Sequence, residues 1–193
     1  TSKPSLAQKI GQTGEDKRIH ILDAPVSGGD IGAKNGTLTV MIGGHKEDLD
    51  QLRDLFMTFS SKLNYFGSYG SGQHAKMANQ IMIAGTMTGM TEMLVYAKAA
   101  GLNLEQVCQT LQSGAAKNFS LGSYGPRILK GDYTPGFFAK HFLKDLRIAL
   151  EEADKMNLDL PATKEAKHLY EVLVDDEKLG NDGTQALIKL WWK

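Results

Sequence analysis

Lys76, Asn79 and Gln80 are the residues whose types and spacing most suggest chemistry. They follow the glycine-rich segment GSYGSG and lie three and four residues apart, so in a helix all three project from one face. A lysine in the opening turns of a helix lies near the positive end of the helix dipole, and both the dipole and burial would lower its pKa, as a general acid or base requires. The two amides could orient a substrate hydroxyl or carbonyl. The alternative interpretation is a solvated lysine whose stem covers apolar neighbours.

The segment DAPVSGGDIGAKNGTLTVMIGG (residues 23–44) is a second candidate site, because it places several glycines between two apolar runs. Its Ser27, Gly28 and Gly29 follow a strand-like stretch, and glycine lets a backbone turn sharply and approach a ligand closely. The serine hydroxyl and the backbone N–H groups could hold one small carboxylate or phosphate. The alternative is a plain turn before the next strand. The P-loop pattern is absent here, and GSYGSGQHA (residues 67–75) does not have the G-x-G-x-x-G spacing.

A third segment, PGFFAKHFLKDLRIALEEA (residues 135–153), combines aromatic and charged residues. Phe137 and Phe138 could form the wall of a pocket, and Lys144 with Asp145 opens a helix that has an apolar face. Taken alone, this pattern is most typical of core packing beside a charged, solvated face.

The composition excludes several classes of protein. Lys and Arg number 22 and Asp and Glu number 22 among 193 residues, so the broad basic field of a nucleic-acid or anionic-membrane binder is not predicted. No apolar stretch reaches the roughly 18 residues of a membrane span, and the N-terminus lacks the apolar centre of a signal peptide. The single cysteine, Cys108, suits a reducing compartment, so we expect a cytoplasmic protein. The five histidines are scattered and predict no metal site.

The elements that must position these residues change in kind near residue 70. Before it, strand-like segments at 20–23, 37–42 and 63–66 accompany an amphipathic helical segment at 46–59, which predicts an α/β layer. After it, the pattern is helical. The predicted domains are therefore an α/β domain over residues 1–70 and an all-α domain over residues 71–193.

The all-α domain is predicted to begin with an unusually long helix, from about Gln73 to Ala100, with Gly101 as its C-cap. Gly85 and Gly89 inside this helix predict close packing by another element, since glycine there costs about 1 kcal/mol relative to alanine. A loop is expected over residues 113–125. Further helices are expected at 104–111, 142–156, 163–174 and 184–192, and the apolar residues at the end of the chain, from Leu187 to Trp192, could bury against another subunit.

Together these segments resemble the β-hydroxyacid dehydrogenase family, which includes 3-hydroxyisobutyrate dehydrogenase and tartronate semialdehyde reductase and is related to 6-phosphogluconate dehydrogenase. Residues 23–44 resemble the family's substrate-binding segment, GSGQHAKMANQ (residues 70–80) its catalytic-lysine segment, and KHFLKDL (residues 140–146) the segment that closes over the cofactor. TSKPSLA (residues 1–7) resembles the end of the family's Rossmann domain. The resemblance extends over essentially the whole chain.

The resemblance implies a role for each candidate residue. Ser27, Gly28 and Gly29 would hold the substrate carboxylate, and Lys76 would donate or accept the proton at the reacting oxygen. Asn79 or Gln80 would fix the hydroxyl, since many members place an asparagine four residues after the lysine, where this chain has Gln80. The residues implied to lie against the nicotinamide cofactor are Thr1, Ser2, Phe137 and Lys144.

The implied fold is an α/β remnant of a Rossmann domain followed by an all-α domain, joined by a long helix. The implied enzyme is an oxidoreductase that uses NAD or NADP on a small β-hydroxy acid or its semialdehyde. The glycine-rich turn that binds the pyrophosphate is absent, so we expect this chain to be inactive by itself. The expected partners are a small carboxylate substrate and further copies of the chain through the all-α domain, with no nucleic acid and no membrane. The alternative is a non-catalytic oligomerisation or ligand-binding module derived from such an enzyme.

Overall fold

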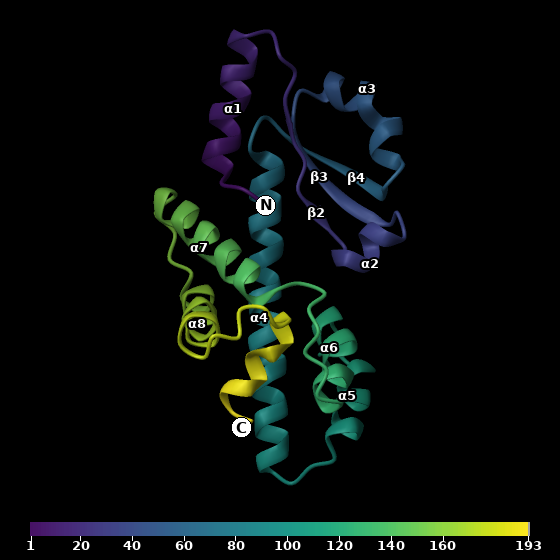
Figure 1. Cartoon of the computed structure of the whole chain (residues 1–193), viewed down its shortest axis with the longest axis vertical. Coiled ribbons are helices and arrows are strands. Elements are labelled where there is room, and N and C mark those ends of the chain that lie inside the picture. The colour runs from purple at the N-terminus through teal and green to yellow at the C-terminus, as the bar shows by residue number, and fades with distance from the viewer. Residues whose placement is uncertain (193) are drawn as a thin grey trace. The chain divides into compact units, whose positions relative to one another are not determined.

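The computed structural model describes residues 1–192 and divides the chain into two compact units. The first unit contains Thr1–Gln80 and Ile148–Asp159, and the second contains Ile81–Arg147 and the described residues from Leu160 onward. The boundaries between the units fall within two helices, α4 (Ser71–Ala99) and α7 (Ala139–Lys155) (Figure 1). The predicted domain boundary after residue 70 stays a prediction.

A small mixed sheet forms the centre of the first unit. Strand β3 (Leu38–Gly44) pairs in parallel with β4 (Ser60–Gly67) and antiparallel with two short strands, β1 (Leu22–Asp23) and β2 (Val26–Ser27). Helix α1 (Pro4–Asp16) precedes the sheet, α2 (Gly29–Lys34) follows β2, and α3 (Lys46–Met57) connects β3 to β4. The buried core of this layer consists of Val40, Ile42 and Leu49, with Phe56 and Leu63 packed against it.

The predicted α/β layer is confirmed, and two of its elements were missed. The predicted strands and the helix at 46–59 overlap β1, β3, β4 and α3. Strand β2 and helix α2 lie inside the glycine-rich segment, which we interpreted as a loop. Strand β2 has only two residues, too few to show an alternation of apolar and polar side chains. Helix α2 begins at Gly29 (φ 63°) directly after Gly28 (φ 129°). Glycine adopts such positive φ angles without steric cost.

The second unit is helical, as predicted. It contains the larger part of α4, then α5 (Leu104–Gln112) and α6 (Phe119–Leu129), the first part of α7, and α8 (Pro161–Glu171). A π-helical turn, η1 (Val172–Asp176), and a 3-10 helix, η2 (Thr184–Leu190), follow. One of its buried clusters centres on Phe142, Tyr170 and Leu187, and another on Met87, Leu94 and Ile188.

The predicted loop over residues 113–125 is wrong in its second half, where α6 forms. Asn118 caps this helix by accepting a hydrogen bond from the Leu121 N–H at 2.9 Å. Two glycines of the segment, Gly122 and Gly125, lie inside this helix and pack against a neighbouring one. A Cβ on Gly122 would lie 2.4 Å from Nε2 of Gln112, and one on Gly125 would lie 3.4 Å from Sγ of Cys108.

Two packing predictions for the second unit are wrong in part. Within the described chain nothing lies within 4 Å of a Cβ placed on Gly85 or Gly89, so no element of this chain packs closely there. Leu187 and Ile188 are completely buried in the unit's own clusters, which excludes these two from a contact with another subunit. Leu190 and Trp192 are half-buried and Trp191 is exposed, so for these three residues such a contact stays a prediction. The C-cap prediction is confirmed, since Gly101 has φ 73° and its N–H donates to the Lys98 carbonyl at 3.0 Å.

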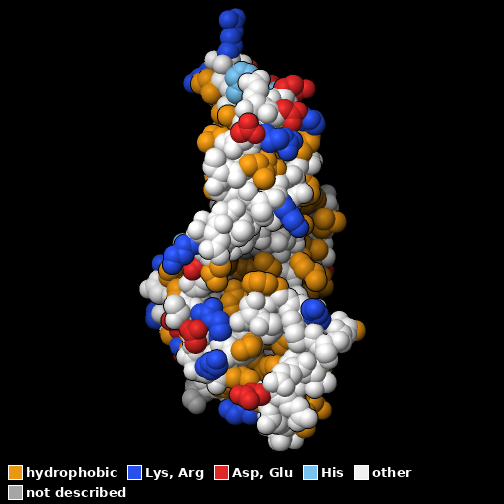
Figure 2. Space-filling view, turned by 90° about the vertical axis from the view of Figure 1, so that its right-hand side faces the viewer, with side chains coloured by type: hydrophobic (Ala, Val, Ile, Leu, Met, Phe, Trp, Pro, Cys, Tyr) orange, Lys and Arg blue, Asp and Glu red, His pale blue; other side chains and the backbone are white. Residues whose placement is uncertain are grey.

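The face drawn in Figure 2 carries charges of both signs. On the face drawn in Figure 2, lysine and arginine side chains are interspersed with aspartate and glutamate, in agreement with the net charge of zero. None of the helices formed by residues 1–192 is long and apolar enough to span a membrane.

Candidate functional site

The beginning of α4 brings together the three residues that the sequence singled out. Lys76 is 8% exposed and Gln80 is 1% exposed, while Asn79 is half-buried. The Asn79 Nδ2 donates a hydrogen bond to Oε1 of Gln80 at 2.8 Å. Lys76 lies in the second turn of α4, which begins at Ser71, and the influence of the helix dipole declines beyond the first turn. Burial, and not the helix dipole, is therefore the feature that distinguishes Lys76 from a solvated surface lysine.

The glycine turn at the start of α2 is the second part of the candidate site. Ser27 is half-buried and pairs with Thr39 in the sheet, whereas Gly28 and Gly29 are exposed. Two successive residues with positive φ produce a sharp change of chain direction at the end of β2. The structure thus confirms a sharp, accessible glycine turn, and its use as a carboxylate site stays a prediction.

The N-terminal residues lie against the first turn of α4. The Ser2 N–H donates to Oε1 of Gln73 at 3.0 Å, and Gln73 is 8% exposed. The backbone before α1 is thereby joined to the helix that carries Lys76. Thr1 is exposed.

Phe137 and Lys144 belong to the second unit. Phe137 is half-buried and packs edge to face on Phe142, with the ring centroids 6.2 Å apart. Lys144 is 46% exposed and its Nζ lies 2.8 Å from Oδ1 of Asp145, which is almost completely buried. The contact of Phe137 and Lys144 with a cofactor stays a prediction.

Sequence reasoning missed the role of Asp23, the buried carboxylate that begins the glycine-rich segment 23–44. Its two oxygens accept hydrogen bonds from the N–H groups of Gly70, at 2.7 Å, and Gln73, at 2.8 Å. The signal was present in the sequence, because a carboxylate at the end of an apolar strand needs hydrogen-bond donors when the strand is buried. The donors could not be identified, since they lie about 50 residues further along the chain.

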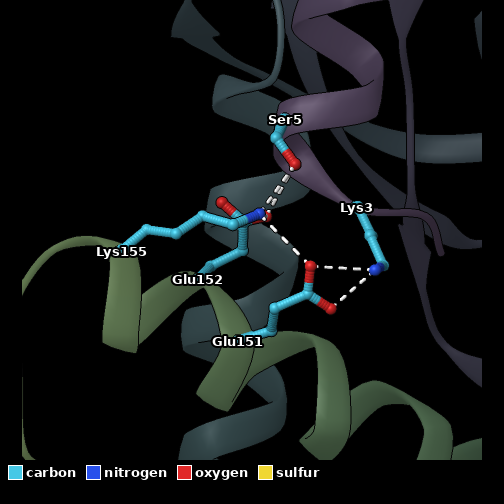
Figure 3. A network of polar contacts seen from close by, with 5 residues as sticks. All are labelled: Lys3, Ser5, Glu151, Glu152 and Lys155. Atoms are coloured by element: carbon cyan, nitrogen blue, oxygen red, sulfur yellow. Dashed lines mark hydrogen bonds and ion pairs between the residues drawn. The ribbon is translucent and has the colours of Figure 1, made fainter.

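A polar network that the sequence did not reveal also belongs to the first unit (Figure 3). Lys3, just before α1, forms an ion pair with Glu151 at 2.6 Å, and the Ser5 hydroxyl donates to Glu152 at 2.9 Å. Lys155 donates to Glu152 at 2.8 Å and lies 3.3 Å from Glu151. The network ties the beginning of α1 to the last turns of α7.

Glu152 is the buried member of this network, only 5% exposed. Burial alone would raise the pKa of its carboxyl, but hydrogen bonds from Lys155 and Ser5 and the nearby charges of Lys155 and His74 outweigh burial and hold that pKa below its usual value. Glu152 is therefore ionised at neutral pH. His74 precedes Lys76 by two residues on α4.

Comparisons with known proteins identify the family of the chain. Residues 1–67 match the family model for the NAD binding domain of 6-phosphogluconate dehydrogenase, and residues 70–191 match the model for the NAD-binding domain of NADP-dependent 3-hydroxyisobutyrate dehydrogenase. The chain is 48% identical to the uncharacterised oxidoreductase YkwC of Bacillus subtilis over 100% of this chain and 67% of that protein. It is 37% identical to 2-hydroxy-3-oxopropionate reductase of Escherichia coli over 86% of this chain and 55% of the reductase.

Solved structures show the same fold. The 3-hydroxyisobutyrate dehydrogenase of Salmonella typhimurium superimposes with a TM-score of 0.89 at 24% identity, over 98% of this chain and 66% of that one. The 3-hydroxyisobutyrate dehydrogenase of Mycobacterium tuberculosis, solved with L-serine, also gives 0.89, at 25% identity, over 97% of this chain and 66% of that one.

The fold is that of NAD(P)-dependent hydroxyacid dehydrogenases. The chain belongs to the β-hydroxyacid dehydrogenase family, and it spans about two thirds or less of the length of the relatives that it matches. The predicted family and the α/β remnant followed by an all-α part are confirmed, as is NAD or NADP as the family's cofactor.

The residues present fit only part of such a cofactor. Residues 1–192 contain no glycine-rich turn between a strand and a helix with the spacing that a pyrophosphate needs. The Ser2 to Gln73 bond nevertheless holds the predicted nicotinamide segment beside the lysine helix. The described residues also contain no group of three or more His, Cys, Asp or Glu side chains placed to hold a metal ion.

Proposed function

We propose that this chain is the substrate-binding and proton-transferring part of an NAD- or NADP-dependent dehydrogenase. Its substrate would be a small β-hydroxy acid or the corresponding semialdehyde, of the 3-hydroxyisobutyrate or tartronate semialdehyde type. The observation that carries the proposal is the buried Lys76 beside the Asn79 and Gln80 amides, in a chain that belongs to this family.

Each part of the site has a distinct task in the proposed reaction. Ser27, Gly28 and Gly29 hold the substrate carboxylate, so that the carbinol carbon is fixed in place. Lys76 accepts the hydroxyl proton when the alcohol is oxidised and returns it when the carbonyl is reduced. Its positive charge stabilises the oxyanion that develops during reduction. The bound nicotinamide supplies or accepts the hydride.

The amide pair of α4 would orient the substrate. The Asn79 Nδ2 is engaged with Gln80, and its Oδ1 is the atom that can accept a hydrogen bond from the substrate hydroxyl. Gln80 is almost completely buried, so we assign it the role of fixing Asn79. Asn79 is thus our choice for the amide that contacts substrate, although the family pattern places that amide at position 80.

The remaining cofactor contacts are proposed for Thr1, Ser2, Phe137 and Lys144, and the residues that bind the pyrophosphate would come from an upstream segment. An apolar groove of about 370 Å³ along one face of α1 supports the proposal of an additional upstream segment. Leu6, Ile10 and Ile19 line this groove, and each is about half exposed. The relatives carry additional chain that could cover it. We therefore expect the 193-residue chain alone to show no turnover.

The test completes the protein by joining the N-terminal third of the Bacillus subtilis relative to Thr1. We expect substrate-dependent formation of NADH or NADPH with β-hydroxy acids, and no such activity from the 193-residue chain. Turnover by neither protein with any β-hydroxy acid or semialdehyde would contradict the proposal. A titration of the 193-residue chain with NADH and NADPH, followed by fluorescence, measures how much of the cofactor site it contains.

The alternative function is a non-catalytic module that assembles copies of the chain or binds a carboxylate. The exposed face of α4, which includes Met82, Gly85, Gly89 and Tyr96, favours assembly through the all-α part. Assembly is compatible with catalysis, so we propose a homo-oligomer in either case. The cytoplasmic location stays a prediction that rests on the single cysteine.

A further inference from the structure

Asp23 is a buried carboxylate that the proposed reaction does not use. It is the last residue of β1, is 7% exposed, and accepts the Gly70 N–H at one oxygen and the Gln73 N–H at the other. The first N–H groups of a helix have no partner inside the helix, and an ionised acceptor binds them more strongly than a neutral one. Asp23 therefore fastens the start of α4 to the sheet.

The backbone around this junction is packed so closely that it leaves no space for a side chain at two glycines. A Cβ on Gly43 would lie 2.5 Å from Oδ1 of Asp23, and one on Gly72 would lie 2.5 Å from the Met41 carbonyl oxygen and 2.8 Å from Oδ2 of Asp23. Gly43 is also the residue opposite Asp23 in the β1 to β3 pairing. The first turn of α4 consequently lies in contact with both strands.

From Asp23 the chain leads directly to the glycine turn. The Pro25 carbonyl accepts the Met41 N–H at 2.9 Å, and Ser27 pairs with Thr39. The chain between Asp23 and Ser27 is thus held to β3 along its length. A displacement of Asp23 would be transmitted to Ser27.

From Asp23 the hydrogen bonds also lead to the lysine. Gln73, whose N–H is bound by Asp23, precedes Lys76 by three residues, so both lie on the same side of α4. The side chain of Gln73 accepts the Ser2 N–H. The first turn of α4 is therefore the point at which the N-terminal segment, the glycine turn and the lysine are joined.

The geometry points to Asp23 as a positioning residue that sets the placement of the Lys76 ammonium relative to the Ser27 turn. This inference rests on the proposed function for its catalytic consequence, whereas the placement of Lys76 can be measured without turnover. Asp23 does not contact substrate or cofactor in this role. It acts through the first turn of α4.

The first experiment measures the reactivity of Lys76 in the 193-residue chain. Each lysine is acetylated with acetic anhydride, and the rate at each site is followed by mass spectrometry in the wild type, Asp23→Asn, Asp23→Ala and Asp48→Asn. Asp48 is the matched control, because it is 6% exposed in the same unit and bonds His20. We expect Lys76 to react several-fold faster in Asp23→Ala, less so in Asp23→Asn, and at the wild-type rate in Asp48→Asn. An unchanged rate in Asp23→Ala, or an equal increase in Asp48→Asn, would overturn the inference.

The second experiment measures kinetics in the completed enzyme, at a temperature where circular dichroism shows each variant to be folded. We expect kcat to fall roughly 100-fold in Asp23→Ala with the cofactor KM nearly unchanged, since a displacement of about 1 Å can cost that much. Asp23→Asn keeps one oxygen acceptor and should restore part of the loss. A residue that only stabilises the fold would leave kcat of the folded fraction unchanged.

The two experiments separate the inference from the proposed function. Absence of turnover in the wild-type completed enzyme would contradict the function, and the acetylation rates would then decide the placement of Lys76 alone. Normal turnover in both the wild type and Asp23→Ala would contradict the positioning role and leave the function intact.

Discussion

At the scale of single residues, Lys76 is distinguished by its burial. It is the one lysine among the buried polar and charged residues of the described chain. Burial of an ammonium group is costly unless polar partners compensate it. The hydrogen-bonded amides of Asn79 and Gln80 lie on the same helix face as Lys76. A lysine kept in such a position is more consistent with chemistry than with a solvated surface.

Glu152 gives a prediction about pH. Because its pKa is lowered in the folded chain, its ionised form stabilises the fold above the ordinary carboxyl value of 4.5, and this contribution is lost as the pH falls through the lowered folded value. The wild type should therefore exceed Glu152→Gln in Tm at pH 7, and the difference should shrink below about pH 4.5. Thermal unfolding of both proteins between pH 3 and pH 7 measures this.

Glu177→Gln is the control for this prediction, because Glu177 is exposed. It should unfold at nearly the wild-type temperature throughout. A difference between the wild type and Glu152→Gln that grows as the pH falls would show that the sign is wrong.

Contacts between residues that are close in the sequence could be predicted, whereas contacts between distant residues could not. Lys76, Asn79 and Gln80 were predicted to be neighbours because helical spacing alone brings them together. Asp23 bonds residues 47 and 50 positions away, and Lys3 bonds Glu151 across 148 positions. Such pairs depend on the tertiary fold, and spacing along the chain contains no signal for them.

At the scale of elements, the contact between α4 and the sheet depends on Gly72. A Cβ there would press on the Met41 backbone carbonyl, which cannot move without breaking the sheet. Gly72→Ala should lower the free energy of unfolding by about 1 to 3 kcal/mol. Denaturant unfolding followed by circular dichroism tests this.

Gly114→Ala is the matched substitution at an open position, since nothing lies within 4 Å of a Cβ there. Its free energy of unfolding should stay within about 0.5 kcal/mol of the wild type. Equal losses in the two variants would mean that the start of α4 is not tightly packed.

Two of the elements that were missed, α2 and α6, share one physical cause. Helix α6 contains Gly122 and Gly125, and α2 begins with Gly29, so composition indicated loops in both places. In α6 the two glycines allow α5 to pack closely against the helix. The free energy gained by this packing outweighs the low helix propensity of glycine. The long α4 was predictable, because its helical pattern continues to Gly101 and the partners that it packs against are not needed to recognise it.

At the scale of the whole molecule, the exposed face of α4 predicts self-association. Met82 is 69% exposed and Tyr96 is 75% exposed, and the two glycines between them would let another helix approach closely. Tyr96→Glu should therefore shift sedimentation from an oligomer toward a monomer without loss of helical circular dichroism.

Phe119→Glu tests whether that shift is specific, because Phe119 is also 75% exposed but lies on α6. It should sediment like the wild type. A monomeric wild type, or equal dissociation by both substitutions, would contradict assembly through this face of α4.

The most direct test of the proposed reaction is the kcat of Lys76→Ala in the completed enzyme, compared with Lys62→Ala at an exposed lysine of β4. If Lys76 transfers the proton, its substitution should lower kcat by roughly 100-fold to 10,000-fold and leave the affinity for the nicotinamide cofactor nearly unchanged. Lys62→Ala should keep the wild-type kcat. Full turnover by Lys76→Ala would contradict the account.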